Sequence, residues 1–421
     1  MSVRYCDYLF SFISFESSKD YQYIYPCCNI FETSMRPRFT YSGRTFNVSR
    51  YRNFIDKTIE NLQNNDDLCK DCGFLKSAPN IDELYSRRLK IKHINIAINQ
   101  GQCHCKCIYC DNGELSINAG IRRDFMPILQ TLCDNNLLDE SCSASWAGGE
   151  PTLVFDFANS CQTLRRLNIY QYFYTNALRP NEEIIKTLIA NTGRVYTSID
   201  SGTREMYYKM KGIDGFDKLC STLSLYAKTP HTVFTKYVMT YENSIKSEID
   251  AFFDLSKKFC DDFVISSVDY KYNFYDNSDI PNKILEAYCY FDAKAELLSI
   301  GNLLFGPSSY IINEVARKRF ERHRVAAGEK LVFFGGGKAY AQFKHLFEET
   351  TPLARLVTMP SALDQEPPGR NLPVMLPEQF FKKDFQARFV VFCSAVNRAA
   401  FAKAIEPYLA YSAGKILWCT L

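Results

Sequence analysis

The chain has 421 residues, a length that predicts about three domains. Hydrophobic residues make up 46% of the sequence and charged residues 23%, which is typical of globular proteins and excludes disordered, collagen-like and coiled-coil classes. The 50 Lys and Arg residues nearly balance the 47 Asp and Glu residues, giving a net charge of +3, so we expect neither nucleic acid nor a membrane surface as a partner.

We expect the 17 cysteines to be reduced thiols. Their number is odd, and the N-terminal residues lack the sustained apolar stretch and small-residue cleavage site of an export signal, so the expected location is cytoplasmic. No apolar run reaches the roughly 18 residues that a membrane span needs. Nine of the cysteines lie within the first 110 residues, in tight groups, while the later ones are isolated at apolar positions, where free cysteine packs as a small hydrophobe.

Three regions follow one another along the chain. Residues 1–82 form a small module rich in cysteine and aromatic residues, with a helical pattern near residues 51–63. Residues 83–315 form the core domain, and residues 316–421 form a C-terminal α/β domain that begins with a charged connector.

The core domain alternates short β-type runs with longer helical patterns. Strands are expected at residues 93–99, 143–147, 170–175, 194–199, 233–239 and 263–268. Helices are expected between them, for example at residues 122–135, 182–191, 216–228 and 248–259. Six β/α units in series predict a parallel sheet with right-handed crossovers, either doubly wound or bent into an open barrel.

The C-terminal domain offers Gly335, Gly336 and Gly337 between an expected strand and an expected helix. Glycines at such a turn can cradle a phosphate. The dinucleotide fingerprint is incomplete, because Tyr340 takes the third glycine position and the second strand ends at Pro360 without a carboxylate. The region resembles small Rossmann-like modules beside sugar-modifying enzymes. We expect a structural or substrate-docking role rather than a working NAD site, with nucleotide or sugar-nucleotide binding as the alternative.

Three cysteines follow the first core strand. Cys103, Cys107 and Cys110 stand in the spacing C-x3-C-x2-C. Three thiolates on one loop can hold three irons of a [4Fe–4S] cluster, whereas electron-transfer clusters usually take four cysteines, so the fourth iron is left for another ligand. Structural zinc is the alternative, and Cys105 supplies a fourth thiolate only in a strained arrangement.

With Tyr109 at the aromatic position, this segment resembles the signature of the radical SAM superfamily, C-x3-C-x-aromatic-C. The resemblance covers roughly residues 90–270 and continues in order at the ends of later strands. The matching segments are Gly148-Gly149-Glu150-Pro151, Tyr174-Thr175-Asn176, Ser198-Ile199-Asp200 and Lys236. The stretch 202–212 (GTREMYYKMKG) resembles the SPASM/twitch branch of the superfamily.

The resemblance implies a partial (β/α)6 barrel that binds S-adenosylmethionine (SAM) at its C-terminal face, where the βα loops converge. Tyr109 would lie against the adenine, Gly148 and Gly149 would let the backbone approach the methionine moiety, and Glu150 would accept from its ammonium. The other expected SAM contacts are Asn176, in the element after the third strand, and Ser198 and Asp200, at the end of the fourth strand, whose polar side chains hold the ribose hydroxyls. Lys236 would face the carboxylate.

The implied reaction is reductive cleavage of SAM at the cluster. One electron, from a donor such as flavodoxin or ferredoxin, enters the sulfonium, and the resulting 5′-deoxyadenosyl radical takes a hydrogen atom from the substrate. The cofactor carries this chemistry, and the protein orients SAM and excludes solvent. No catalytic acid or base is identified in the sequence.

The N-terminal module also carries grouped thiols. Cys69 and Cys72 are the best candidate ligands, and Cys6 with either Cys27 or Cys28 completes a set of four. The pattern resembles the SPASM/twitch module with its auxiliary [4Fe–4S] cluster, although that module usually follows the barrel. Structural zinc and unligated core thiols are the alternatives.

The substrate is not identified by the sequence. The C-terminal domain favours a carbohydrate or a nucleotide-sugar, and peptide modification is the alternative within the same branch. Two hypotheses from other functional classes are an NAD-dependent oxidoreductase with structural zinc and a non-catalytic binding protein.

Overall fold

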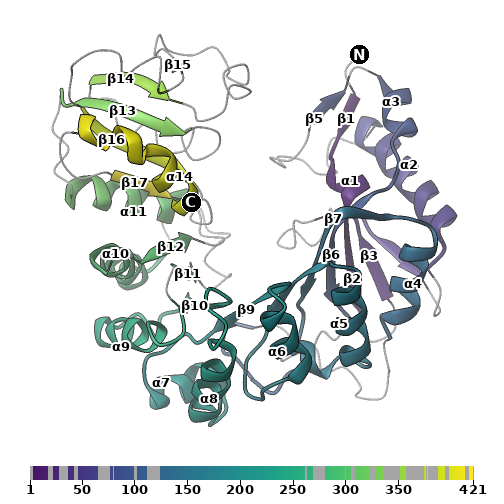
Figure 1. Ribbon diagram of the computed structural model, residues 1–421, viewed down its shortest axis with the longest axis horizontal. Helices are drawn as coiled ribbons and strands as arrows, with labels where there is room; N and C mark the ends of the chain where they lie inside the picture. The colour runs from purple at the N-terminus through teal and green to yellow at the C-terminus, as the bar shows by residue number, and fades with distance from the viewer. Residues whose placement is uncertain are drawn as a thin grey trace. The chain divides into compact units, whose positions relative to one another are not determined.

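The computed structural model describes most of the chain as two compact units (Figure 1). The first unit comprises Met1–Thr197 and Lys211–Val233, and the second comprises Ser198–Met210 and Phe234–Leu421. The structure describes residues 3–17, 22–27, 37–41, 46–64, 76–78, 80–98, 102–110, 124–260, 263–268, 280–298, 300–304, 309–322, 328–335, 351–356, 374–375, 377, 387–393, 398–412 and 417–420. Among these residues, no helix has the length and apolar character needed to cross a bilayer.

The first unit is built on a mostly parallel sheet. Its strands run in the spatial order β9-β8-β7-β6-β2-β3-β4. They are β2 (Phe12–Ser17), β3 (Gln22–Tyr25), β4 (Phe39–Tyr41), β6 (Ile91–Ala97), β7 (Leu138–Trp146), β8 (Tyr170–Tyr174) and β9 (Gly193–Ser198). Strands β6 to β9 are parallel neighbours, β2 is parallel to β6, and β3 and β4 continue the sheet antiparallel. Separately, β1 (Val3–Tyr5) pairs antiparallel with β5 (Lys76–Ala78).

Helices follow the strands of the first unit. They are α1 (Tyr8–Ser11), α2 (Val48–Asn64), α3 (Ile81–Ser86), α4 (Met126–Asp134), α5 (Phe157–Arg166), α6 (Glu182–Ile189) and α8 (Phe216–Tyr226), with a short 3-10 turn, η2 (Pro151–Leu153). Alternate residues of the strands form the apolar core, as expected for a sheet with one face covered by helices. The Trp146 ring lies 4.8 Å from the Phe157 ring of α5 and 6.3 Å from the Phe125 ring, centroid to centroid.

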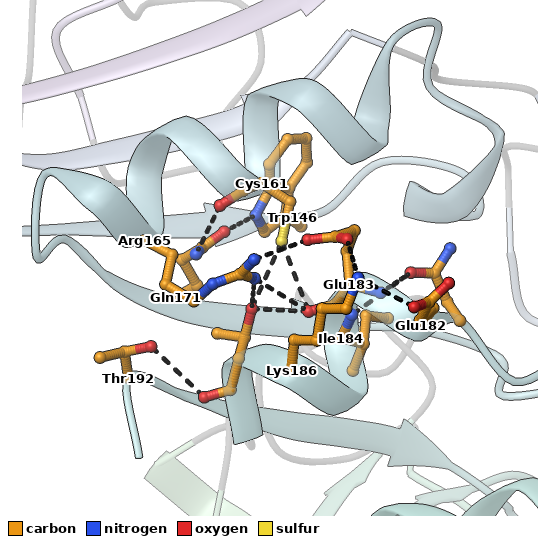
Figure 2. A network of polar contacts seen from close by, with 11 residues as sticks. Trp146, Cys161, Arg165, Gln171, Glu182, Glu183, Ile184, Lys186 and Thr192 are labelled. Atoms are coloured by element: carbon orange, nitrogen blue, oxygen red, sulfur yellow. Dashed lines mark hydrogen bonds and ion pairs between the residues drawn. The ribbon is translucent and has the colours of Figure 1, made fainter. Parts of the chain in front are cut away.

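A polar network lies within this covered face (Figure 2). The fully buried Gln171 accepts a hydrogen bond from Trp146 Nε1 (3.0 Å) and donates one to the carbonyl oxygen of Cys161 (3.1 Å). Beside it, Arg165 of α5 forms a 2.8 Å ion pair with Glu183 of α6. The network therefore connects α5 and α6 with strands β7 and β8, whose C-terminal ends carry part of the candidate site.

Replacing Gln171 with alanine is expected to lower the free energy of unfolding by about 3 kcal/mol, because a buried donor and a buried acceptor lose their partners. Urea unfolding followed by the fluorescence of buried Trp146 measures the change. Gln130→Ala is the matched control, since Gln130 lies exposed on α4 and donates to Asp134, and it should change stability by less than about 0.5 kcal/mol. Equal effects of the two substitutions would contradict the structural role of Gln171.

The second unit contains two sets of parallel strands. The first has the order β12-β11-β10, formed by β10 (Val233–Met239), β11 (Phe263–Val268) and β12 (Gly301–Leu304). Its helices are α7 (Arg204–Lys211), whose last residue, Lys211, belongs to the first unit, α9 (Lys246–Ser256), α10 (Asn282–Leu297) and α11 (Ser309–Arg322). The buried Asp292 of α10 pairs with Arg319 and Arg322 of α11, which joins these two helices.

The C-terminal sheet of the second unit has the order β15-β14-β13-β16-β17, with all pairs parallel. Its strands are β13 (Lys330–Gly335), β14 (Thr351–Leu356), β15 (Val374–Met375), β16 (Arg388–Cys393) and β17 (Leu417–Thr420). Between β16 and β17 the chain forms α14 (Arg398–Ile405) and the 3-10 segment η7 (Glu406–Tyr411). The first strand in sequence is therefore central, as in doubly wound α/β folds.

The six expected core strands are confirmed as β6 to β11, and the four expected helices as α4, α6, α8 and α9. The large parallel sheet is confirmed with them. The closure into a partial (β/α)6 barrel and the division at residues 82 and 315 stay predictions. One feature was not expected: β2, from the N-terminal region, joins the core sheet beside β6.

Candidate functional site

The cysteine loop, residues 102–110, lies after the C-terminal end of β6. Cys103 is exposed, and Cys107 and Cys110 are half-buried. A turn closes the second part of the loop, with Cys110 N donating to Cys107 O at 3.1 Å. The loop thus carries the three thiols of the motif on a short, hydrogen-bonded segment.

Hydrogen bonds favour the thiolate form of Cys103. Its Sγ accepts from the backbone N–H of Cys105 at 3.4 Å and from Nδ2 of Asn176 at 3.5 Å. The pKa of the Cys103 thiol falls to about 7, first because the Cys105 thiol donates to it, and further because of the backbone of Cys105 and the amide of Asn176. A thiolate is the form that binds metal.

Cys105 has the opposite character. Its thiol is buried, and its pKa is raised because it donates to Cys103 and Cys107 and because burial disfavours its charged form. Cys105 is therefore the thiol of this loop that stays protonated, whereas Cys103 favours the thiolate form.

The donor set of the loop fits a [4Fe–4S] cluster. Three thiols on one short loop can each bind a separate iron, and the fourth iron is left for another ligand. A thiolate next to hydrogen-bond donors, as at Cys103, suits such a cluster.

Glu150 connects the segments around the loop. Its carboxylate is buried, with 2% exposure. It accepts from N and Oγ1 of Thr152 (3.2 and 2.8 Å), from Oγ1 of Thr175 (2.9 and 3.0 Å) and from the N–H of Asn176 (2.8 Å). The backbone N–H of Glu150 donates to Gln102 O at 2.7 Å. The ends of β7 and β8 are thereby held together beside the cysteine loop.

Backbone conformation explains two small residues near this carboxylate. Gly148 has a φ of +91°, a conformation that side chains rarely adopt. Ala177, directly after Asn176, is fully buried with a φ of +51°. Glycine adopts this left-handed conformation more readily than other residues do, so a small residue fits position 177 best.

Ser198, Asp200 and Lys236 belong to the second unit. Asp200 is fully buried, has a φ of +62°, and accepts from the N–H of Val238 at 2.7 Å through Oδ1. Its carbonyl oxygen accepts from Nδ2 of Asn243 at 2.9 Å. At least one oxygen of this carboxylate therefore holds strand β10, and the expected contacts of these three residues with the cofactor stay predictions.

The N-terminal and C-terminal motifs are only partly within the described residues. Cys6 and Cys27 are described, both half-buried, whereas Cys69, Cys72 and Cys28 lie outside. Gly335 ends β13 with a φ of +88°, and Gly336, Gly337, Tyr340 and Pro360 lie outside the described residues. The auxiliary cluster and the role of the glycine turn stay predictions.

The sheet face opposite the α5 and α6 network carries polar and aromatic side chains. We call it the tyrosine face, defined by residues that register places on the same side of neighbouring strands: His93, Tyr170, Tyr172, Tyr174 and Tyr196. The Tyr174 and Tyr196 rings stack at 5.2 Å and 22°, and Tyr174 is 45% exposed.

His93 lies at one side of the tyrosine face. Its Nδ1 is 2.8 Å from Ser143 Oγ, and its Nε2 is 2.9 Å from Ser145 Oγ. Burial lowers its pKa to about 4, so the imidazole is neutral at pH 7, with one nitrogen donating and the other accepting.

Two site residues were not identified from the sequence. Thr175 donates to both oxygens of Glu150, and Lys211 contacts Tyr109 with its ammonium, 2.8 Å from the phenolic oxygen. Thr175 lies inside the recognised Tyr-Thr-Asn element, which was a usable signal. Lys211 lies in a helix with one other lysine, Lys209, and no pattern in the sequence separates the buried Lys211 from the exposed Lys209.

Comparisons with known proteins agree with these motifs. No family model matches the chain. The cysteine-type anaerobic sulfatase-maturating enzyme of Clostridium novyi is 29% identical over 122 residues, which cover 26% of this chain and 32% of that protein. A probable GTP 3',8-cyclase of Saccharolobus islandicus is 26% identical over 119 residues, covering 28% and 38%. The chain thus matches about a third of the length of these curated relatives.

Solved structures show only a distant likeness. Streptococcus suis SuiB bound to its precursor peptide SuiA has a TM-score of 0.43 and 14% identity, covering 85% of this chain and 82% of that one. The structure of anSMEcpe with bound AdoMet has a TM-score of 0.39 and 22% identity, covering 49% and 59%.

The ordered motifs and the curated relatives point to the same class. At low identity they indicate the radical SAM superfamily, with relatives of the SPASM type. The resemblance predicted from the cysteine motif is confirmed.

Proposed function

We propose that the protein is a radical SAM enzyme that cleaves SAM reductively at a [4Fe–4S] cluster and abstracts hydrogen from a substrate. The observation that carries this proposal is the cysteine loop, in which Cys103 is held near the thiolate form by Asn176 and Cys105. The bound cluster supplies the electron for SAM cleavage, and this cleavage supplies the carbon radical that takes a hydrogen atom from the substrate.

The residues of the first unit have separate tasks. Cys103, Cys107 and Cys110 hold the cluster, and the backbone N–H of Cys105 donates to the Cys103 thiolate. Tyr109 covers the adenine. The resemblance to the superfamily signature implies these roles. The hydrogen bonds of Cys103 and the raised pKa of the Cys105 thiol support them.

Glu150 has two tasks in this proposal. Its carboxylate holds the ends of β7 and β8 beside the loop through donors from Thr152, Thr175 and Asn176. The negative charge also attracts the ammonium group of SAM, as the superfamily resemblance implies. In the second unit, Ser198 and Asp200 are proposed for the ribose and Lys236 for the carboxylate.

We place the substrate over the tyrosine face. Tyr174, the exposed end of this face, is two residues from Asn176, whose amide donates to Cys103. Tyrosine rings offer flat apolar area with a polar tip, which suits a carbohydrate ring as well as a peptide side chain.

Two substrate classes are supported by different observations. The parallel C-terminal sheet with its central first strand supports a Rossmann-like domain and hence a carbohydrate or nucleotide-sugar. The name of the Clostridium relative, a sulfatase-maturating enzyme, supports a peptide substrate. The proposed electron donor is flavodoxin or ferredoxin, and the proposed location is the cytoplasm.

The N-terminal thiols are proposed as an auxiliary site. Cys6 and Cys27, together with Cys69 and Cys72, would hold a second [4Fe–4S] cluster. This proposal rests on the resemblance to the SPASM/twitch pattern.

Metal analysis after anaerobic reconstitution tests the cluster assignment. We expect about four irons per chain for the core cluster and about eight with the auxiliary one. A control variant with Cys103, Cys107 and Cys110 all replaced by alanine should lose about four irons and keep the remainder. Stoichiometric zinc without iron would contradict the proposal and favour the NAD-dependent oxidoreductase with structural zinc.

A further inference from the structure

Lys211 and Gly212 contact the cysteine loop at two points. The backbone oxygen of Lys211 accepts from the N–H of Lys106 at 2.8 Å. Gly212 has a φ of +64°, and a Cβ there would lie 3.1 Å from Cβ and O of Lys106. Lys106 stands between two cysteines of the loop, so the close approach fixes the backbone that joins them.

The side chain of Lys211 makes the second contact. Its Nζ donates to the phenolic oxygen of Tyr109 at 2.8 Å and lies 5.2 Å from the centroid of the same ring. A cation near an aromatic face is attracted by the ring quadrupole. Tyr109 is thereby held between Cys107 and Cys110.

Burial makes this lysine unusual. Its exposed fraction is 3%, whereas lysine side chains are almost never fully buried. Desolvating an ammonium is costly, and an apolar side chain of equal length would fill the same space without that cost. Packing alone is therefore a poor reason for a lysine at this position.

We propose that Lys211 is a positioning and tuning residue of the cluster site: it fixes Tyr109 and raises the reduction potential of the [4Fe–4S] cluster. The proposal rests on the proposed function. Reduction adds one electron to the cluster and makes it more negative. A fixed cation behind the loop stabilises the reduced form, and a low-dielectric surrounding strengthens the effect.

The positioning effect and the charge effect are separable by substitution. Lys211→Met removes the charge and the hydrogen bond while keeping the length of the side chain. Lys211→Gln removes the charge and keeps a donor for Tyr109. Lys211→Arg keeps the charge. Lys209→Met is the matched control, because Lys209 lies exposed on the same helix and undergoes the same change of charge.

The experiment is a dithionite titration of the reconstituted full chain, followed by EPR of the reduced cluster, with iron content and SAM dissociation constant measured on the same samples. We expect lower midpoint potentials for Lys211→Met and Lys211→Gln, and wild-type potentials for Lys211→Arg and Lys209→Met. The SAM dissociation constant should rise about tenfold in Lys211→Met and less in Lys211→Gln.

Two outcomes would overturn the inference. One is a wild-type midpoint potential in Lys211→Gln at full iron content. The other is an equal shift of the midpoint potential in Lys209→Met and Lys211→Gln, which would mean that the potential responds only to the net charge of the protein. Failure of the wild-type chain to bind a cluster is a distinct result, because it would contradict the proposed function before any variant is compared.

Discussion

Replacement of Cys107 by alanine is expected to lower the rate of SAM cleavage more than about a hundredfold, because the substitution removes a thiolate from one iron, and even outer-shell partners of metal ligands are worth 10–100-fold. Cys103→Ala and Cys110→Ala should be equally damaging. The rate is measured as 5′-deoxyadenosine formed per chain under anaerobic conditions with dithionite, and iron content is measured beside it.

Cys105→Ala is the control for the ligand assignment. Cys105 donates to its neighbours, and its backbone N–H, which also donates to Cys103, remains after the substitution. We expect SAM cleavage to fall less than about tenfold, the smallest loss expected for an outer-shell partner. If Cys105→Ala lowers the rate as much as Cys107→Ala does, the assignment of the three ligands is wrong.

Replacement of Glu150 by glutamine is the second substitution with a large expected effect. The amide keeps the shape of the side chain, but its NH2 group faces the N–H of Asn176 or the hydroxyl of Thr175, so one donor meets another. The substitution also removes the charge proposed for the ammonium of SAM. We expect the SAM dissociation constant to rise tenfold or more, which corresponds to about 1.4 kcal/mol or more.

Equilibrium binding of SAM to the reconstituted chain measures this effect, and urea unfolding of the same variant measures the structural part. Glu140→Gln on the same strand β7 is the matched control, since Glu140 is exposed. If the Glu150→Gln variant is less stable and yet binds SAM as the wild type does, Glu150 holds β7 and β8 together and does not contribute to SAM binding.

The core strands were predictable because their signal is local. The run 233–239, for example, is β-branched and aromatic and is followed by a helical pattern, and it forms β10 as expected. The cysteine loop was predictable for the same reason, since its residues are neighbours in sequence. Local signals therefore located most of the candidate site.

The pairing of β2 with β6 was not predictable. Phe12 lies opposite His93 in this pair, with about 80 residues between them in sequence. A run such as FISFES indicates a strand but contains no information on its partner. The same limit applies to Lys211, whose burial depends on contacts with a loop about 100 residues away.

The hydrogen-bond partners of Glu150 show a further limit. The sequence placed a carboxylate after β7, and its hydrogen bonds with Thr152, Thr175 and Asn176 became visible only in the structure. A motif specifies which residue types stand at a site. Which donors each of them satisfies depends on how the strand ends meet.

Formation of 5′-deoxyadenosine by the anaerobically reconstituted chain, with SAM and dithionite and without added substrate, tests the central claim most directly. We expect the product to form in the wild type, to disappear when Cys107 is replaced by alanine, and to persist in Cys105→Ala. A wild-type chain that carries a full complement of iron and releases no 5′-deoxyadenosine would contradict radical SAM chemistry and favour a non-catalytic binding protein.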